Sequence, residues 1–423
     1  LARADEAFRE LVDRAGDLAD QGRFAAAAEA LRSAQRMPGF DRHPALRAAW
    51  ARLGEHGRRS TLLSASPLYS YDADEVFTQP PTVAVREDGA VAATGRWTGE
   101  VDVWDLAAGE RLHTFDSGEG GSARDIRFAV DGMLVVVLTS AGTIRRLSLE
   151  TGSKYLFTDE FGAISAFAVN PAGDRILIGD ATGTLRLRDL PVGDILHAWP
   201  AHGGKVHAAA LSADGRYAAT LGSGHPEANR FGAPPNENEI HLWRLGEDRP
   251  VWTLPSRTSG ERLDFSADGR TLFVSHSPYV GAWDVGTGEL RYSVLGRSTG
   301  ALSDIGVVFG ADGRLAATPD RGSLSVWETG TGQVVRTLSM PETPGAFALS
   351  ADGAFAVTGA DRTVRVWDVG SGRCLRTLEG HQGPLYQVAL SRDGTLLVTV
   401  DLRPAMWVWE LAWDFDFPPD AGD

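Results

Sequence analysis

Apolar and polar positions alternate in short runs along most of the chain, and these runs return at a nearly constant interval. A run that ends in Val-Asp-Val-Trp-Asp around Trp104 reappears in related form down the chain, each time after a small acidic turn such as the one at Asp352. Two markers that share a period of roughly 40–44 residues indicate an array of equivalent units. The units end at Trp104, Leu147, Arg188, Trp243, Trp283, Trp327, Trp367 and Trp409.

Each unit has the same internal order of short β-rich runs separated by Gly, Asp and Pro turns. The last unit shows this order most clearly, at 376–381, 385–390, 395–400 and 406–410. Four short strands in a unit of about 40 residues are typical of one blade of a β-propeller, in which neighbouring sheets bury their apolar sides. The pattern therefore predicts a mainly β fold.

Residues 1–60 follow a helical period instead. Apolar side chains form one stripe from Phe8 to Ala19 and a second from Phe24 to Ala34, with Gly22 between them and a shorter stripe around Trp50. This spacing predicts an N-terminal α-helical hairpin or connector over residues 1–60.

The Trp-bearing copies, the Ser-Ala-Asp-Gly turns and the Gly380-His381 pair resemble the WD-repeat (Trp-Asp) β-propeller family over about residues 67–417. The resemblance implies an eight-bladed WD-repeat β-propeller, closed by an N-terminal strand near 67–71 that supplies the outer strand missing from the last unit. A seven-bladed ring with one degenerate unit outside it is the alternative. Residues 418–423 are expected to form a flexible tail.

The spacing of Gly22, Phe24, Ala27 and Leu31 is similar to the centre of one tetratricopeptide repeat. A single repeat cannot bury its own apolar face, so the hairpin is expected to dock against the array or against upstream sequence. A structural connector is favoured over a separate peptide-binding module.

In the WD-repeat family a His, a Ser or Thr, an Asp and the Trp form a buried hydrogen-bonded tetrad. Only the last unit matches most of it. The resemblance implies structural roles for His381, Thr399, Asp401 and Trp409, and for Trp104, Trp243, Trp283, Trp327 and Trp367.

The motifs that could indicate catalysis have simpler explanations. Gly-Thr-Gly at 286–288 recurs in related form in most units, as expected for a turn, and no Lys-Ser/Thr follows it. His202 and His207 lack a third metal ligand, and no Gly-x-Ser-x-Gly elbow occurs. We therefore expect no catalytic residues, no cofactor and no metal, and hence no enzyme. A propeller hydrolase or lactonase is the least favoured alternative.

Charge and cysteine content narrow the partners and the compartment. The formal net charge is −15, and residues 1–60 carry 11 Arg against 9 Asp or Glu, so the remainder carries −15 − 2 = −17. An acidic array argues against nucleic acid or anionic lipid as a partner. No apolar run approaches the ~20 residues of a membrane span. The single cysteine, Cys374, fits a reducing compartment, so we expect a cytoplasmic protein with no membrane contact.

Candidate binding residues lie on the face that carries the loops between second and third strands and the loops leading into first strands. Loops on a rigid scaffold commonly hold binding residues, and Trp, Tyr and Arg dominate interfaces. The insertion 223–239 and an aromatic residue at a turn tip, Trp97, stand out, although Trp97 could equally pack on a neighbouring blade. The candidates are Arg96, Trp97, Arg124, His207, His225, Phe231, Tyr279 and Tyr386.

The functional expectation is a non-catalytic protein- or peptide-binding platform. The Arg-rich helical start and the ending 409–418 resemble C-terminal sensor regions of actinobacterial multidomain signalling proteins. That resemblance implies a sensing or regulatory module of a larger bacterial protein, with an upstream kinase or NTPase domain of the same polypeptide as a partner. An autonomous scaffold that holds several partners is the alternative.

Overall fold

The structure is a computed structural model of the 423-residue chain. It describes every residue except 1, 41–42, 55, 72–81, 87–88, 97, 107, 117–120, 130–131, 158–162, 225–237, 257–261, 277, 297–306, 311, 404 and 419–423. The fold divides into two compact units. One comprises 1–67, 393–397 and 409–423, and the other comprises 68–392 and 398–408. The boundaries fall inside three strands of one sheet.

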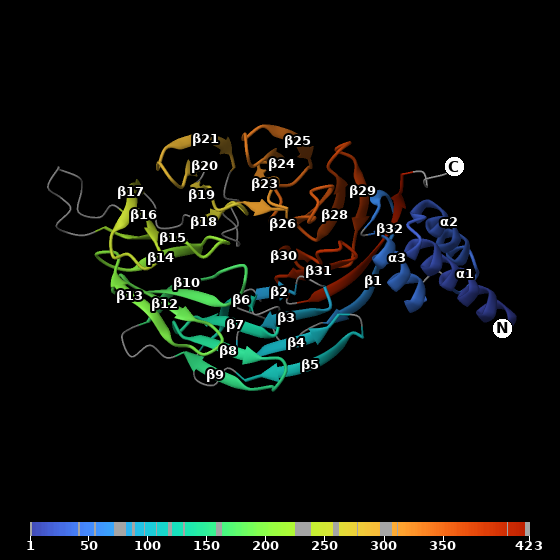
Figure 1. Cartoon of the computed structure of the whole chain (residues 1–423), viewed down its shortest axis with the longest axis horizontal. Helices are drawn as coiled ribbons and strands as arrows, with labels where there is room; N and C mark the ends of the chain where they lie inside the picture. The colour runs from blue at the N-terminus through green and yellow to red at the C-terminus, as the bar shows by residue number, and fades with distance from the viewer. Residues whose placement is uncertain are drawn as a thin grey trace. The chain divides into compact units, whose positions relative to one another are not determined.

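Eight four-stranded sheets form the blades of a propeller, and the pairing is antiparallel in every pair whose register the structure gives. In Figure 1 the first strand of a blade lies toward the centre of the ring and the last strand toward its periphery.

The first four blades follow one another along the chain. Blade 1 comprises β2 (Thr82–Val85), β3 (Val91–Gly95), β4 (Val101–Asp105) and β5 (Glu110–Phe115). Blade 2 comprises β6 (Ala123–Ala129), β7 (Leu134–Thr139), β8 (Ile144–Ser148) and β9 (Lys154–Phe157). Blade 3 comprises β10 (Ile164–Val169), β11 (Arg175–Asp180), β12 (Thr184–Asp189) and β13 (Ile195–Pro200). Blade 4 comprises β14 (Val206–Leu211), β15 (Tyr217–Ser223), β16 (Asn238–Arg244) and β17 (Pro250–Ser256).

The last four blades complete the ring. Blade 5 comprises β18 (Arg262–Phe265), β19 (Thr271–His276), β20 (Tyr279–Asp284) and β21 (Leu290–Leu295). Blade 6 comprises β22 (Val308–Phe309), β23 (Leu315–Asp320), β24 (Ser323–Glu328) and β25 (Val334–Ser339). Blade 7 comprises β26 (Ala346–Leu349), β27 (Phe355–Ala360), β28 (Thr363–Asp368) and β29 (Cys374–Leu378). Blade 8 comprises β30 (Leu385–Leu390), β31 (Leu396–Asp401), β32 (Met406–Asp416) and, outermost, β1 (Arg58–Tyr71).

The expected eight-bladed propeller is confirmed, and the seven-bladed alternative is wrong, because the two units without a Trp, ending at Leu147 and Arg188, form complete four-stranded blades. The outer strand of blade 8 comes from the N-terminal side of the chain. It begins at Arg58 rather than at Pro67 and so extends the segment expected to supply it.

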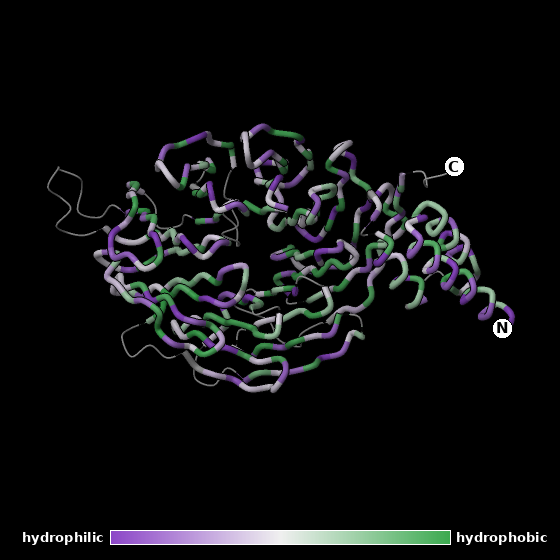
Figure 2. The backbone as a smooth tube through the Cα atoms, viewed as in Figure 1, coloured by the Kyte–Doolittle hydropathy of each residue, from purple (hydrophilic) through white to green (hydrophobic). Residues whose placement is uncertain are grey.

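Apolar side chains fill the spaces between successive blades. Figure 2 shows hydrophobic stretches along the strands, interrupted by hydrophilic turns. Each of six core clusters takes its residues from two neighbouring blades; the cluster between blades 1 and 2, for example, joins Val103 to Ile126 and Val135. Burying one such aliphatic side chain stabilises the fold by about 1.5–3 kcal/mol, so each blade depends on its neighbours.

In three blades the Trp is anchored to the strand beside it, whereas the buried indole N–H of Trp327 has no partner among the described residues although Thr318 stands at the equivalent position. Trp104, Trp243 and Trp367 donate their indole N–H to Thr94, Thr220 and Thr358 at 2.8–2.9 Å. In each case the Thr stands two residues after the cross-strand partner of the Trp. Blades 2 and 3 lack the Trp, and the Thr position there holds Val137 and Ile178. In these two blades the indole donor and the threonine acceptor are therefore both missing.

Four outer strands, those of blades 1, 4, 5 and 6, are tied to the next blade by what we call a latch. A side chain of the outer strand donates to the carbonyl of the residue that follows the last residue of the next blade's third strand. His113 reaches the Leu149 oxygen at 3.1 Å and Trp252 the Val285 oxygen at 3.0 Å. Tyr292 donates to Thr329, and Arg336 donates to Val369 at 3.2 Å.

Blade 2 departs from the latch pattern. Tyr155 holds the equivalent place on β9, opposite Arg146 of β8, but Arg146 makes the bond. Its guanidinium lies 4.8 Å over the Tyr155 ring and donates to the Leu190 oxygen at 2.6 Å.

The unit that contains the N-terminus holds α1 (Ala2–Asp20), α2 (Phe24–Gln35) and α3 (Pro44–Gly54), which confirms the expected helical segment. Its core includes the C-terminal end of β32. Trp50 stacks on Phe415 with ring centroids 5.9 Å apart, and Arg32 donates to Asp414 at 3.0 Å. A Cβ on Gly54 would lie 2.6 Å from the Phe415 ring, so glycine permits this close approach.

Candidate functional site

The histidine of the last unit lies in a fully buried polar chain. His381 Nδ1 is 2.9 Å from Asp401 Oδ2, and its Nε2 is 2.7 Å from Thr399 Oγ1. Burial alone would raise the pKa of Asp401, but hydrogen bonds from His381 and from the backbone N–H groups of Ala405 and Gly383 outweigh it, so the pKa lies below its ordinary value. Because the side chains of His381 and Asp401 have no solvent exposure, this chain holds the loops together and does not offer a site to a substrate.

A second such chain occurs in blade 4, where sequence reasoning found none. His202 Nε2 is 2.9 Å from Thr220 Oγ1, which also accepts the indole N–H of Trp243. The His–Thr spacing of 18 residues equals that of His381 and Thr399, and this spacing was the signal that could have revealed it. The position of Asp401, two residues after the Thr, holds Gly222 in blade 4, and His241 stacks on His202 with ring centroids 4.4 Å apart.

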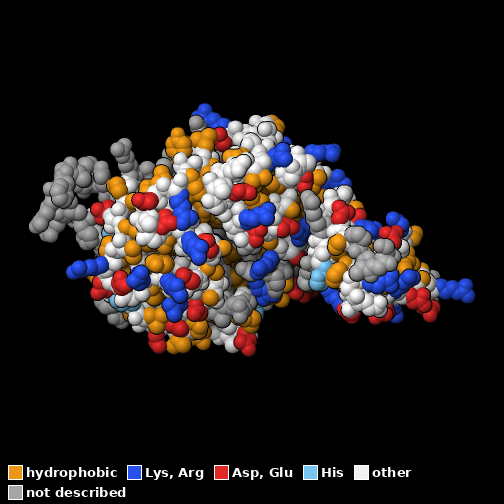
Figure 3. Space-filling view, turned by 45° about the horizontal axis from the view of Figure 1, so that its top comes forward, with side chains coloured by type: hydrophobic (Ala, Val, Ile, Leu, Met, Phe, Trp, Pro, Cys, Tyr) orange, Lys and Arg blue, Asp and Glu red, His pale blue; other side chains and the backbone are white. Residues whose placement is uncertain are grey.

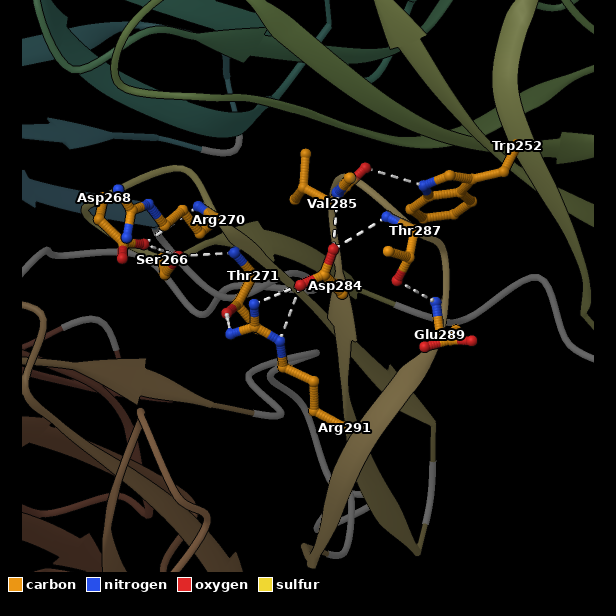
Figure 4. Close-up of polar contacts among 11 residues, drawn as sticks. Trp252, Ser266, Asp268, Arg270, Thr271, Asp284, Val285, Thr287, Glu289 and Arg291 are labelled. Atoms are coloured by element: carbon orange, nitrogen blue, oxygen red, sulfur yellow. Dashed lines mark hydrogen bonds and ion pairs between the residues drawn. The ribbon is translucent and has the colours of Figure 1, made fainter.

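The Gly-Thr-Gly string of blade 5 forms a turn with its donors already used (Figure 4). The backbone N–H groups of Gly286 and Thr287 both donate to Asp284 Oδ1 at 2.9 Å. Arg291 binds the other carboxylate oxygen and, above all through this hydrogen bond, lowers the pKa of Asp284. Gly288 has φ 72°, which glycine adopts without strain. A phosphate would have to displace a carboxylate here, so the string is not a nucleotide-binding loop.

We define the loop face of the propeller by the loops between second and third strands and the loops leading into first strands, and the turn face by the other turns. Of the candidates on the loop face, Trp97, His225 and Phe231 lie outside the described residues. Arg96, on blade 1, is occupied: its guanidinium lies 2.6 Å from the buried Asp102 and 3.1 Å from Glu100.

The other candidates belong to four different blades, so the structure spreads them around the ring. Tyr279, the first residue of β20, is 45 % exposed, and Arg124 of β6 is also exposed. Tyr386 of β30 is half-buried. His207 of β14 is half-buried at the ends of β15 and β16; burial and the nearby Lys205 lower its pKa, against a hydrogen bond to Asn238 that raises it. The imidazole at this position therefore stays neutral at pH 7.

The described part of the chain offers no group of three or more His, Cys, Asp or Glu side chains arranged to hold a metal ion. None of its helices combines the length and the apolarity needed to span a bilayer. On the surface shown in Figure 3, basic and acidic side chains are interspersed with apolar ones, so neither sign of charge forms a continuous area there.

Comparisons with known proteins agree with this architecture. The family model "WD domain, G-beta repeat" matches residues 332–368 and 372–403. Among solved structures, the chain is similar to the computationally designed Ika8 protein, with a TM-score of 0.62, 21 % identity, and coverage of 82 % of this chain and 100 % of that one. None of the curated proteins compared with it matches. Blades 6 to 8 contain the matched segments, and the described chain consists of an eight-bladed β-propeller with WD40 repeats within residues 332–403, together with three N-terminal helices.

Proposed function

We propose that the protein is a non-catalytic platform that binds a protein or peptide through its loop face. The WD40 propeller fold suits a protein-binding platform, because its rigid blades hold many loops on one side. The observation that carries the proposal is the exposed Tyr279, the first residue of β20, which follows the loop from β19 on the loop face. A large aromatic residue exposed on a short, fixed hairpin is a typical interface anchor.

The finer proposal is that the platform is a sensing or regulatory module of a larger bacterial signalling protein. It would sense its bound protein or peptide and regulate an upstream kinase or NTPase domain of the same polypeptide. We also place it in the cytoplasm, supported by the free, exposed thiol of Cys374, which suits a reducing compartment. These steps depend on the resemblance of the two ends of the chain to actinobacterial sensor regions.

An autonomous scaffold for several partners is the second candidate, and one observation favours it. The helical unit has a cavity of its own, about 470 Å³, bounded by α1, α2 and α3 and lined by Val12, Gly16 and Ala49 among others. A concave surface in the helical unit, in addition to the loop face, would give a scaffold a place for another partner.

Affinity capture with the full chain tests the proposal. The bait is compared with a Trp97→Ala/Tyr279→Ala variant and with a variant that lacks 223–239, and Leu290→Ala on the turn face is the matched control. We expect the loop-face variants to weaken capture of the same partner at least tenfold. Equal capture by all four baits would show that the loop face is the wrong one.

A further inference from the structure

An exposed apolar surface lies where blades 2 and 3 meet, on the turn face and not on the loop face. We call it the blade 2–3 rim and define it by Tyr155, Pro191, Val192, Ile195 and Leu196. Val192 is 71 % exposed, and Tyr155, Ile195 and Leu196 are 50–52 % exposed. The rim is continuous, since Arg146 both stacks on Tyr155 and donates to the carbonyl oxygens of Leu190 and Pro191.

Other blades show what usually stands at this turn. In blades 5, 6 and 7 the residue equivalent to Val192 is Thr287, Thr331 or Ser371. Each hydroxyl oxygen serves its own turn as an acceptor, from the N–H of Glu289, Gln333 or Arg373. Blade 3 closes the same turn, with Gly193 N–H donating to Asp189 at 2.9 Å, but presents valine to solvent. The turn needs no valine, so this side chain is available for another contact.

The outer strand of blade 2, β9, lacks the bulge that other outer pairs contain. In six of the seven outer pairs whose register the structure gives, a bulge shifts the register just before the Trp position. The β8–β9 pair runs without a shift. Bulges twist an edge away and hinder the addition of another strand, so the edge of β9 is the most suited to receive one.

The charge of these two strands specifies the partner further. β8 and β9 contain Arg145, Arg146 and Lys154 and no acidic residue, in an array that is otherwise strongly acidic. Lys154 is exposed beside Tyr155, and its ammonium donates to the backbone carbonyl oxygen of Asp116 at 3.4 Å. A lysine on an edge strand discourages pairing with a like strand but favours one that carries carboxylates.

We propose that the blade 2–3 rim binds an extended segment of a partner protein, which adds as a strand to β9. The segment places an acidic side chain at Lys154 and an aliphatic side chain against Val192 and Ile195. Backbone hydrogen bonds give the affinity, and alternate side chains give the specificity. This surface is independent of the loop face, so either proposal can fail while the other holds.

The probe is a displayed library of random linear peptides about ten residues long, selected on the full chain. We expect enriched peptides in which β-branched or aromatic residues alternate with Asp or Glu. Val192→Asp/Ile195→Asp should weaken the best peptide at least tenfold by fluorescence polarisation. Leu290→Asp is the matched control, because Leu290 stands at the position equivalent to Ile195 in blade 5 and is also 50 % exposed.

Two further measurements separate strand addition from other modes. Lys154→Glu should reverse the preference from acidic to basic peptides. N-methylation of alternate amides should abolish binding along one edge of the peptide and leave the other edge tolerant, because only one edge pairs with β9. The proposal is overturned if no peptide depends on the rim, if Leu290→Asp weakens binding as much, or if both N-methylated peptides bind equally.

Discussion

The indole of Trp283 lacks the hydrogen bond that other tryptophans at this position in their blades make to a threonine hydroxyl. Its Nε1 is buried and has no hydrogen-bond partner among the described residues, unlike the indoles of Trp104, Trp243 and Trp367. The acceptor position, two residues after its cross-strand partner Leu272, holds Val274 instead of threonine. A buried donor without an acceptor costs about 1–3 kcal/mol.

Val274→Thr should therefore stabilise the propeller. Threonine has nearly the shape of valine, and its hydroxyl oxygen would stand where Thr94, Thr220 and Thr358 accept from their tryptophans. We expect the free energy of unfolding to rise by about 1 kcal/mol, measured by chemical denaturation.

The matched control is Val137→Thr in blade 2. Val137 occupies the same place, but the residue in the Trp position is Leu147, whose side chain has no N–H to donate. The new hydroxyl would be buried unpaired, so unfolding should become easier by about 1–3 kcal/mol. Equal effects of the two substitutions would contradict the pairing rule.

Asp401 makes the free energy of unfolding depend on pH. Its pKa is held below the unfolded value by hydrogen bonds that outweigh burial, so its contribution is present above about pH 4 and is lost as pH falls through the folded pKa. Asp401→Asn should cost about 1–3 kcal/mol at pH 7, because its amide would face backbone donors. In denaturation series from pH 7 to pH 2, the gap between the two proteins should narrow; a constant gap would show that Asp401 does not titrate in this range.

At the scale of elements, much of the strand pattern could be predicted because it follows from residues close together in the sequence. Acidic turns and alternating apolar residues mark the strands around Asp352 and Asp268, and helical spacing marks α1 to α3. The latches could not be predicted. Their acceptors are backbone carbonyls, which every residue possesses, so nothing in the sequence around Leu149 or Val285 shows which side chain will reach it.

Less of the candidate site than of the fold could be predicted from the sequence. Arg96 is a candidate binding residue next to Trp97, yet its guanidinium pairs with the buried Asp102, which lies six residues further along. Such a pairing depends on how a hairpin twists and not on composition. Val192 and Ile195 could not be singled out, since isolated apolar residues in a turn give no signal until the structure shows their exposure.

The stability of the helical unit should depend on the C-terminal end of β32. Phe415 is 5 % exposed and stacks on Trp50, so Phe415→Ala should cost about 3–5 kcal/mol in that unit. Thermal melts followed by far-UV circular dichroism should show earlier loss of the helical signal. Leu63→Ala, an exposed position on β1 in the same unit, is the control and should leave the melt unchanged. Helices that melt as in the original protein would refute this dependence.

At the scale of the whole propeller, the ring closes between its first and last inner strands. Gln387 of β30 bonds the backbone of Val83 twice, accepting its N–H at 3.0 Å and donating to its carbonyl at 2.7 Å. The side chain acts as a short piece of strand between blades 1 and 8. Closed rings hide strand edges that would otherwise pair with other molecules.

Gln387→Ala should therefore loosen the closure, because it leaves two backbone groups of Val83 without their partner. We expect a loss of about 1–3 kcal/mol in stability and faster amide hydrogen exchange in β2 and β30. Gln382→Ala, an exposed glutamine that leads into the same strand, is the control. Exchange that accelerates evenly over all blades would argue against a local opening.

The latches all run in one direction along the chain, from the outer strand of one blade to the blade that follows it. Each donor is encoded in one repeat but fits the turn of the next, as Tyr292 of blade 5 fits Thr329 of blade 6. Burial raises the pKa of Tyr292 to about 12, so the phenol keeps its proton and stays a donor. A repeat transplanted whole would therefore carry a donor suited to the neighbour it left behind. The transferable module of this propeller runs from the outer strand of one blade through the third strand of the following blade.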